Sequence, residues 1–119
     1  MGKINIALSR ILISQLFIIS GIFKITGYIT TQIYMLHMGV PGFLLPFVIL
    51  TEIGGGLALL LGYHERIAAF LLAGFSVIAA LIFHHDFSNQ MQLINFMKNL
   101  AITGGLLLIV EYGGKKTRY

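Results

Sequence analysis

Four long hydrophobic segments follow one another along the chain and are separated by short polar stretches. They cover approximately residues 6–25, 43–62, 67–84 and 93–111. Each is close to the ~20 residues that an α-helix needs to cross the ~30 Å hydrocarbon core of a bilayer. The pattern predicts an all-α membrane protein with four transmembrane helices. The short connections predict that these helices form an antiparallel bundle.

The stretch between the first two hydrophobic segments has a different pattern. Its apolar residues recur at helical spacing beside polar ones: Ile29, Ile33, Leu36 and Val40. Tyr28 and Tyr34 suit the headgroup level of a membrane. We therefore expect a short interfacial segment that lies on the outer surface of the bilayer. An ordinary extracellular loop is the alternative.

The composition agrees with a membrane protein built as one unit. The chain has 119 residues, of which 57% are hydrophobic and 10% are charged, whereas about a quarter of the residues of an average soluble domain are charged. The predicted helices use most of the chain. We expect a single transmembrane domain over residues 1–119, so any site must be built from the helices and their short loops.

Basic residues predict the orientation of the bundle, because cytoplasmic loops and ends carry the excess of Lys and Arg. One side would hold most of them: Lys3, Arg10, Arg66, Lys115, Lys116 and Arg118. We expect both termini in the cytoplasm. The net charge of +4 then suits anionic lipid headgroups, and we do not expect nucleic acid as a partner.

Ionisable residues inside the hydrophobic segments are the candidate site. Charge in a membrane costs roughly 2.5 to 3.5 kcal/mol per residue on insertion scales, so such residues usually face a bundle interior and have a function. Lys24, Glu52, His84, Lys98 and its neighbour Asn99 would meet in the outer half of the bundle. We treat them as candidate ligand-binding residues.

Several properties of this candidate site stay open at the level of sequence. The protonation state of Glu52 is undetermined, and either His84 or His85 could face inward. A buried ion-pair network that only fixes the order of the helices is a competing interpretation. We expect no metal, because adjacent histidines point to different faces of a helix and nearby lysines disfavour a cation.

The opposite end of the bundle offers a second pair of charges. Arg10 and Glu111 should lie at comparable depth on the first and last helices, so we expect them to form a structural ion pair. The turn that contains His64, Glu65 and Arg66 is interpreted as a solvated connection. The chain has no cysteine, which excludes thiol chemistry and iron–sulfur ligation for this chain acting alone.

The order of these features resembles a known family. The features are Ser20-Gly21-x-x-Lys24, Gly39-x-Pro41, Glu52-x-Gly54-Gly55, Gly62, His84 and Lys98-Asn99. As an ordered set they resemble the DoxX family of small four-helix bacterial membrane proteins. The family takes its name from a subunit associated with thiosulfate:quinone oxidoreductase, so the resemblance implies an inner-membrane protein with a quinone or sulfur-redox link. It does not imply that this chain is an enzyme.

Three functions compete. In the first, the chain is a redox-associated subunit, a partner of a membrane oxidoreductase, whose pocket holds a quinone headgroup or a small anion. A quinone ring would stack well against an aromatic pocket lining, which these residues could supply: Phe17, Phe23, Phe47 and Phe83. In the second, the chain is a non-catalytic assembly protein with purely structural charges. In the third, a homo-oligomer forms a pathway for a small solute or protons.

Overall fold

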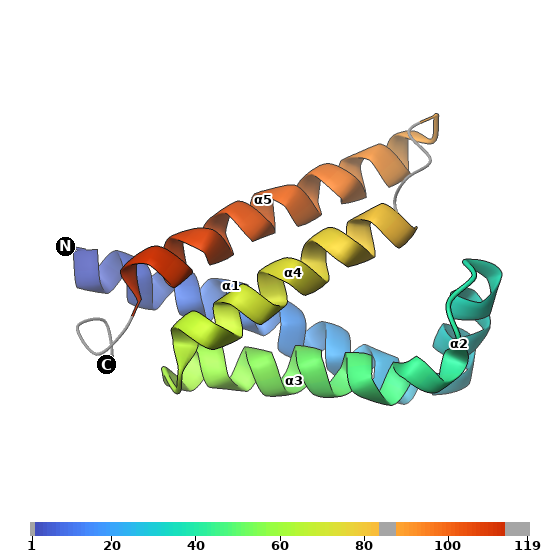
Figure 1. The fold of residues 1–119 in the computed structure, drawn as a ribbon, viewed down its shortest axis with the longest axis horizontal. Coiled ribbons are helices and arrows are strands. Elements are labelled where there is room, and N and C mark those ends of the chain that lie inside the picture. The colour runs from blue at the N-terminus through green and yellow to red at the C-terminus, as the bar shows by residue number, and fades with distance from the viewer. Residues whose placement is uncertain (1, 84–87, 114–119) are drawn as a thin grey trace.

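The computed structural model describes residues 2–83 and 88–113, and within these residues it contains helices and short connections but no β-strand. The elements appear in Figure 1 in the order α1 (Gly2–Thr26), α2 (Tyr28–His37), the 3-10 helix η1 (Gly42–Leu44), α3 (Leu45–Leu61), α4 (Glu65–Phe83) and α5 (Gln90–Tyr112). The all-α prediction is therefore confirmed.

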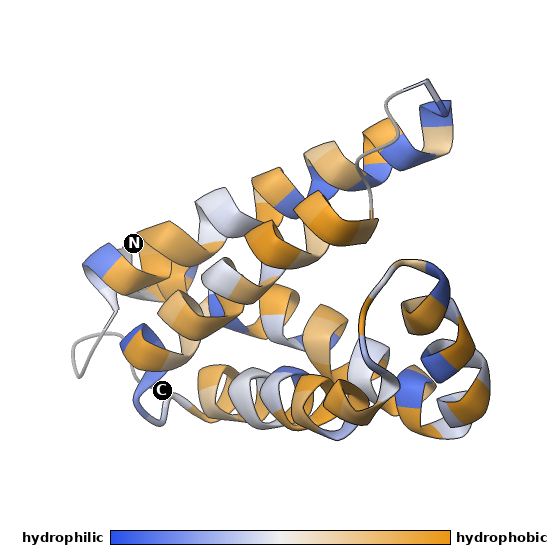
Figure 2. Cartoon of the chain, turned by 45° about the vertical axis from the view of Figure 1, so that its right-hand side comes forward, coloured by the Kyte–Doolittle hydropathy of each residue, from blue (hydrophilic) through white to orange (hydrophobic). Residues whose placement is uncertain are grey.

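The predicted spans correspond to helices that are long and apolar enough to cross a membrane. Within the described residues there are four of them: Ile4–Thr26, Gly42–Leu61, Glu65–Phe83 and Gln90–Tyr112. Hydrophobic residues predominate along these long helices, and hydrophilic residues are more frequent near the ends of the bundle, where α2 mixes both kinds (Figure 2). The stretch between the first two spans contains the short helix α2, as expected.

Local sequence explains where the helices begin and end. Pro46 lies in the first turn of α3, where its missing amide hydrogen costs little. Gly62 ends this helix in the left-handed conformation, with φ 73°, which glycine adopts without steric cost. The side chain of Asn89 accepts hydrogen bonds from the amides of Met91 and Gln92 at 2.9 and 3.3 Å, which caps α5.

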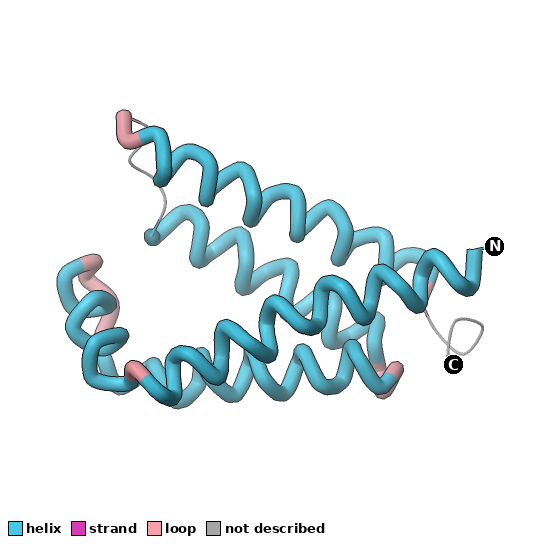
Figure 3. The backbone as a smooth tube through the Cα atoms, turned by 180° about the vertical axis from the view of Figure 1, so that it is seen from behind, coloured by secondary structure: helices cyan, strands magenta, loops and turns pink. Residues whose placement is uncertain are grey.

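The long helices form two packed pairs that diverge toward one end. Helix α1 packs against α3, α4 packs against α5, and the contact between α3 and α4 joins the pairs. The pairs lie close where the N-terminus, the α3–α4 turn and the end of α5 meet, and they separate toward α2 (Figure 1). The view from behind shows α1 and α5 separating in the same direction (Figure 3). We call these two ends the N-terminal end and the α2 end.

The core lies toward the N-terminal end. Its buried apolar residues come from all the long helices: Phe17, Leu59, Ala69, Leu72, Ala73, Leu106 and Ile109. Lipid tails are as apolar as these side chains, so close packing, rather than the hydrophobic effect, is what holds membrane helices together. This core is where all four long helices pack together.

Glycine allows α1 and α3 to approach each other closely. A Cβ atom built on Gly56 would lie 2.8 Å from Cγ1 of Ile18 and 3.3 Å from the backbone oxygen of Ser14. Gly54, two residues earlier on the same helix, has no described atom within 4 Å of such a Cβ. Only one of these two glycines is thus needed for packing.

This difference gives a matched pair of variants. Gly56→Val should lower the free energy of unfolding by about 1 to 3 kcal/mol, the usual cost of overpacking, because the backbone of α1 blocks the new side chain. Gly54→Val should lower it less, since its side chain enters open space. Unfolding of both variants in mixed micelles checks this prediction. Equal losses would contradict the close approach.

A buried ion pair closes the N-terminal end and corrects the sequence prediction. Nη1 of Arg10 lies 3.7 Å from Oε1 of Glu65, and the two side chains are 0% and 1% exposed. The predicted partner Glu111 is exposed on α5, so the expected Arg10–Glu111 pair was wrong, as was a solvated Glu65. The cause is geometric: the first turn of α4 meets α1 here.

A hydrogen bond joins the same turn to the last helix. Nε of Arg66 donates to the carbonyl of Val110 at 2.7 Å, which ties α4 to the end of α5.

Candidate functional site

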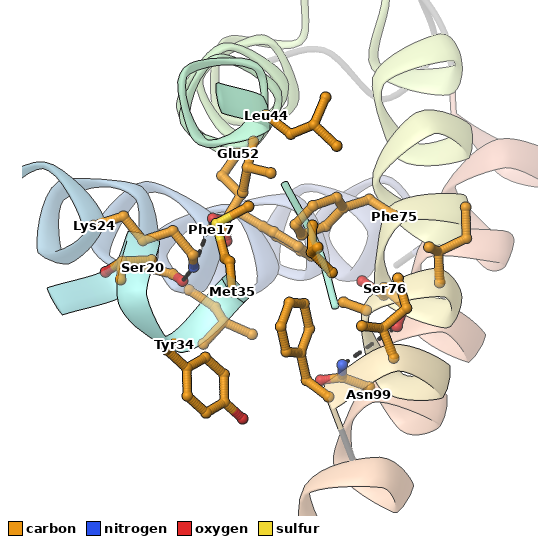
Figure 4. A pocket seen from close by; sticks show the side chains of 18 of the residues that line it. Phe17, Ser20, Lys24, Tyr34, Met35, Leu44, Glu52, Phe75, Ser76 and Asn99 are labelled. Carbon is orange, nitrogen blue, oxygen red and sulfur yellow. Dashed lines mark hydrogen bonds and ion pairs between the residues drawn. The ribbon is translucent and has the colours of Figure 1, made fainter. Parts of the chain in front are cut away.

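A pocket of about 460 Å³ fills the space between the diverging helix pairs at the α2 end. Most of its wall is apolar, and α2 contributes to it together with all the long helices (Figure 4). The residues that line it are Leu16, Phe17, Ser20, Lys24, Thr31, Tyr34, Met35, Val40, Leu44, Val48, Glu52, Phe75, Ser76, Ile78, Ala79, Ile82, Phe83, Asn99 and Ile102. Its volume lies in the ~300 to 1,000 Å³ range of small-molecule sites.

One side of the pocket carries a compact polar group. Nζ of Lys24 lies 2.7 Å from Oε1 of Glu52 and donates a hydrogen bond to Oγ of Ser20 at 2.8 Å. The side chain of Glu52 is 4% exposed, whereas that of Lys24 is 27% exposed. The carboxylate is therefore enclosed, and the ammonium group remains accessible from the pocket and from outside.

A close helix contact positions this polar group. A Cβ atom on Gly21 would meet the side chain of Ile53 and lie 3.5 Å from Cβ of Glu52. The missing side chain allows α1 to lie directly against α3 at the level of the glutamate. Lys24 follows Gly21 by three residues, so it rises from the same side of α1 and reaches Glu52.

A second polar position lies on the other helix pair. Nδ2 of Asn99 on α5 donates to the backbone carbonyl of Ser76 on α4 at 3.3 Å. Figure 4 shows Asn99 and Ser76 across the pocket from Lys24 and Glu52. An amide carries two N–H donors and an oxygen acceptor, so Asn99 keeps further hydrogen-bonding capacity for a ligand.

Helix α2 covers one end of the pocket. Tyr34 stacks on Phe83 of α4 with ring centroids 5.4 Å apart and an interplanar angle of 21°, and Met35 is 3% exposed. Sequence reasoning treated this stretch as a surface segment and missed its part in the pocket. Its predicted apolar residues Ile29 and Ile33 are exposed, which suits contact with lipid, while the opposite face supplies the lining.

The structure brings together part of the predicted site. Lys24, Glu52 and Asn99 line the pocket, while Lys98 is exposed and is absent from the described lining. His84 and His85 lie outside the described residues, so the choice between them as the inward-facing histidine stays a prediction. The aromatic residues divide similarly. Phe17 and Phe83 line the pocket, whereas Phe23 and Phe47 are exposed.

The chemistry of the pocket follows from these contacts. The charges of Lys24 and Glu52 balance each other at a distance of 2.7 Å. An ammonium group has three N–H donors. Lys24 donates one of them to Ser20 and forms an ion pair with Glu52, so a remaining N–H can turn to a ligand. The site can offer hydrogen bonds from two opposite walls to a molecule that is otherwise apolar.

Comparisons with known proteins agree with this architecture. The DoxX family model matches residues 6–85. Inner membrane protein YqjF of Escherichia coli K12 is 50% identical over 110 residues, which is 92% of this chain and 85% of the relative. Inner membrane protein YphA of the same organism is 32% identical over 113 residues, with 89% and 81% covered. No solved structure matches. The chain belongs to the DoxX family.

Proposed function

We propose that this chain is a membrane-embedded binding subunit whose pocket holds the headgroup of a quinone. The observation that carries the proposal is the pairing of a largely apolar cavity of about 460 Å³ with hydrogen-bond donors on opposite walls. A quinone ring is flat, uncharged and apolar over its faces. Its two carbonyl oxygens accept hydrogen bonds at opposite edges.

The charge balance favours a neutral ring over a small anion. Glu52 lies 2.7 Å from Lys24, so the positive charge that would attract an anion already faces a carboxylate. An anion that enters this pocket would also leave water for a mostly apolar wall, which is costly without further positive charge. Sequence reasoning kept both ligands open, and the geometry supports the quinone.

The hydrogen-bond donors would bind the carbonyl oxygens of the quinone, and the aromatic side chains would contact its ring. Lys24 would donate to one carbonyl oxygen through its remaining N–H, and Asn99 would donate to the other. Phe17, Phe75 and Tyr34 contribute aromatic faces and edges against which a ring can stack. Helix α2 would cover the bound headgroup.

The proposal includes a location and a partner. Both relatives are named inner membrane proteins, which supports an inner membrane for this chain, and the basic residues support cytoplasmic termini. The chain has no cysteine, so we propose that electrons pass between the quinone and another membrane-associated oxidoreductase subunit. This chain would hold the quinone in place.

Occlusion of the pocket tests the proposal without removing a charge. Ala79 lines the pocket on α4, so Ala79→Phe fills it, whereas Leu81→Phe on the same helix alters an exposed position. Mass spectrometry of small molecules extracted from gently purified protein should find a quinone enriched over bulk membrane lipid. The enrichment should disappear in Ala79→Phe and persist in Leu81→Phe.

The other outcomes point to other functions. If the extract matches bulk lipid in the wild type, the quinone proposal fails. The ion pairs Lys24–Glu52 and Arg10–Glu65, which each join two helices, would then favour the assembly interpretation with purely structural charges. If both variants retain the quinone, it binds elsewhere on the chain.

A further inference from the structure

A groove of about 360 Å³ lies on α1 beside the pocket. Its lining residues are Leu16, Ile19, Ser20, Phe23, Lys24 and Thr31. Ile19 is 47% exposed and Phe23 is 68% exposed, so the floor of the groove is apolar and faces the surroundings of the bundle. It differs from the pocket in opening outward.

The groove and the pocket share part of their walls. Leu16, Ser20, Lys24 and Thr31 line both of them. The partly exposed Lys24 ammonium therefore stands between the enclosed Glu52 and the outside of α1. A molecule held at Lys24 would therefore have the groove directly beside it.

The direction of the groove matches a lipid tail. Phe23, Ile19 and Leu16 follow one side of α1 from the α2 end toward the middle of the span. The seven steps from Phe23 to Leu16 cover about 10 Å along the helix axis. A chain that starts near Lys24 and descends along these residues would run parallel to the tails of the surrounding lipids.

We infer that the groove holds the hydrocarbon tail of the ligand whose headgroup occupies the pocket. The inference rests on the proposed function and specifies the substrate class: a quinone with a long tail, drawn sideways from the membrane past Lys24 and Thr31. A short-chain quinone from water would use the pocket but leave the groove unused.

Two photoreactive probes separate the pocket from the groove. One is a decyl-tailed benzoquinone with a diazirine within the tail, and the other is a tailless benzoquinone with the diazirine on the ring. Each is added to full-length protein in vesicles of bacterial lipid, and peptide mass spectrometry locates the label. The tail probe should label Ile19 and Phe23 on α1, which line the groove but not the pocket. The ring probe should label the pocket lining.

A matched pair of tryptophan variants sharpens the test. Ile19→Trp fills the groove, whereas Ile22→Trp changes a position of similar exposure, 45% against 47%, outside it. Ile19→Trp should reduce labelling of α1 by the tail probe about tenfold, as expected when a side chain occupies the space of the ligand. Ring-probe labelling should remain in both variants.

Each contrary result has its own meaning. If the tail probe labels α1 no more than a diazirine-bearing decane does, or labels Val48 and Ile78 instead, the groove does not hold the tail and the inference fails. The proposed function would survive that result as long as the ring probe labels the pocket. If the ring probe also misses the pocket, both fail together.

Discussion

Glu65→Ala should lower the free energy of unfolding by about 3 to 5 kcal/mol, the usual cost of removing one partner of a buried ion pair. The reason is that Arg10 is 0% exposed and would lose the carboxylate that lies 3.7 Å from its Nη1. Burying a charge without its counter-charge is expensive in a low-dielectric interior. Reversible unfolding in mixed micelles measures the effect.

Glu111→Ala is the matched control, because Glu111 is the exposed glutamate at the end of α5. Its effect should stay within about 0.5 kcal/mol, as for most surface substitutions. The double variant Arg10→Met with Glu65→Leu should recover most of the loss, since apolar replacement of a buried pair is often neutral or stabilising. If Glu111→Ala proves the more damaging change, the assigned pair is wrong.

Lys24→Met should weaken quinone binding by about 10- to 150-fold. This range corresponds to the 1.5 to 3 kcal/mol of a hydrogen bond made by a charged group. The proposed contact from Lys24 to a quinone carbonyl would be lost, while the rest of the lining remains. Titration of purified protein in nanodiscs with a decyl-tailed benzoquinone measures the affinity.

Lys98→Met supplies the comparison, because both lysines lie in predicted spans but Lys98 is exposed and outside the described lining. The affinity of the Lys98→Met protein for the decyl-tailed benzoquinone should stay within about twofold of the wild type. The binding stoichiometry separates the site from the fold: a lower affinity at full stoichiometry reports a lost contact, whereas a lower stoichiometry reports unfolded protein. Equal weakening by both variants would contradict the central role of Lys24.

The helices could be predicted from sequence because bilayer thickness sets the length of an apolar span. Which helices are neighbours could not be predicted in the same way. A transmembrane helix is apolar on its lipid-facing side as well as on its packed side, so the pattern of hydrophobic residues hardly distinguishes the two. Glu65 is an example. Depth alone allowed Glu111 as a partner of Arg10, and the position of the first turn of α4 beside α1 decides for Glu65.

The charged part of the candidate site could be predicted from sequence, because a charged residue inside a span is easily recognised. Lys24 and Glu52 were found because an ionisable residue in a membrane needs a partner, and the structure pairs them at 2.7 Å. Lys98 satisfied the same rule but lies on an exposed face of α5. The contribution of α2 was missed because Tyr34 and Met35 carry no charge, and their place in the pocket wall depends on a turn of the chain at Gly27.

The separation of the tight N-terminal end from the open α2 end has an evolutionary consequence. The buried Arg10–Glu65 pair and the apolar core hold one end of the bundle, and the pocket occupies the other. Under the proposed function, substitutions in the pocket wall can then change ligand preference with little effect on the packing of the N-terminal end. If the pocket binds a ligand as proposed, a bundle of 119 residues can in this way accept different membrane-soluble molecules while the packing of its N-terminal end stays the same.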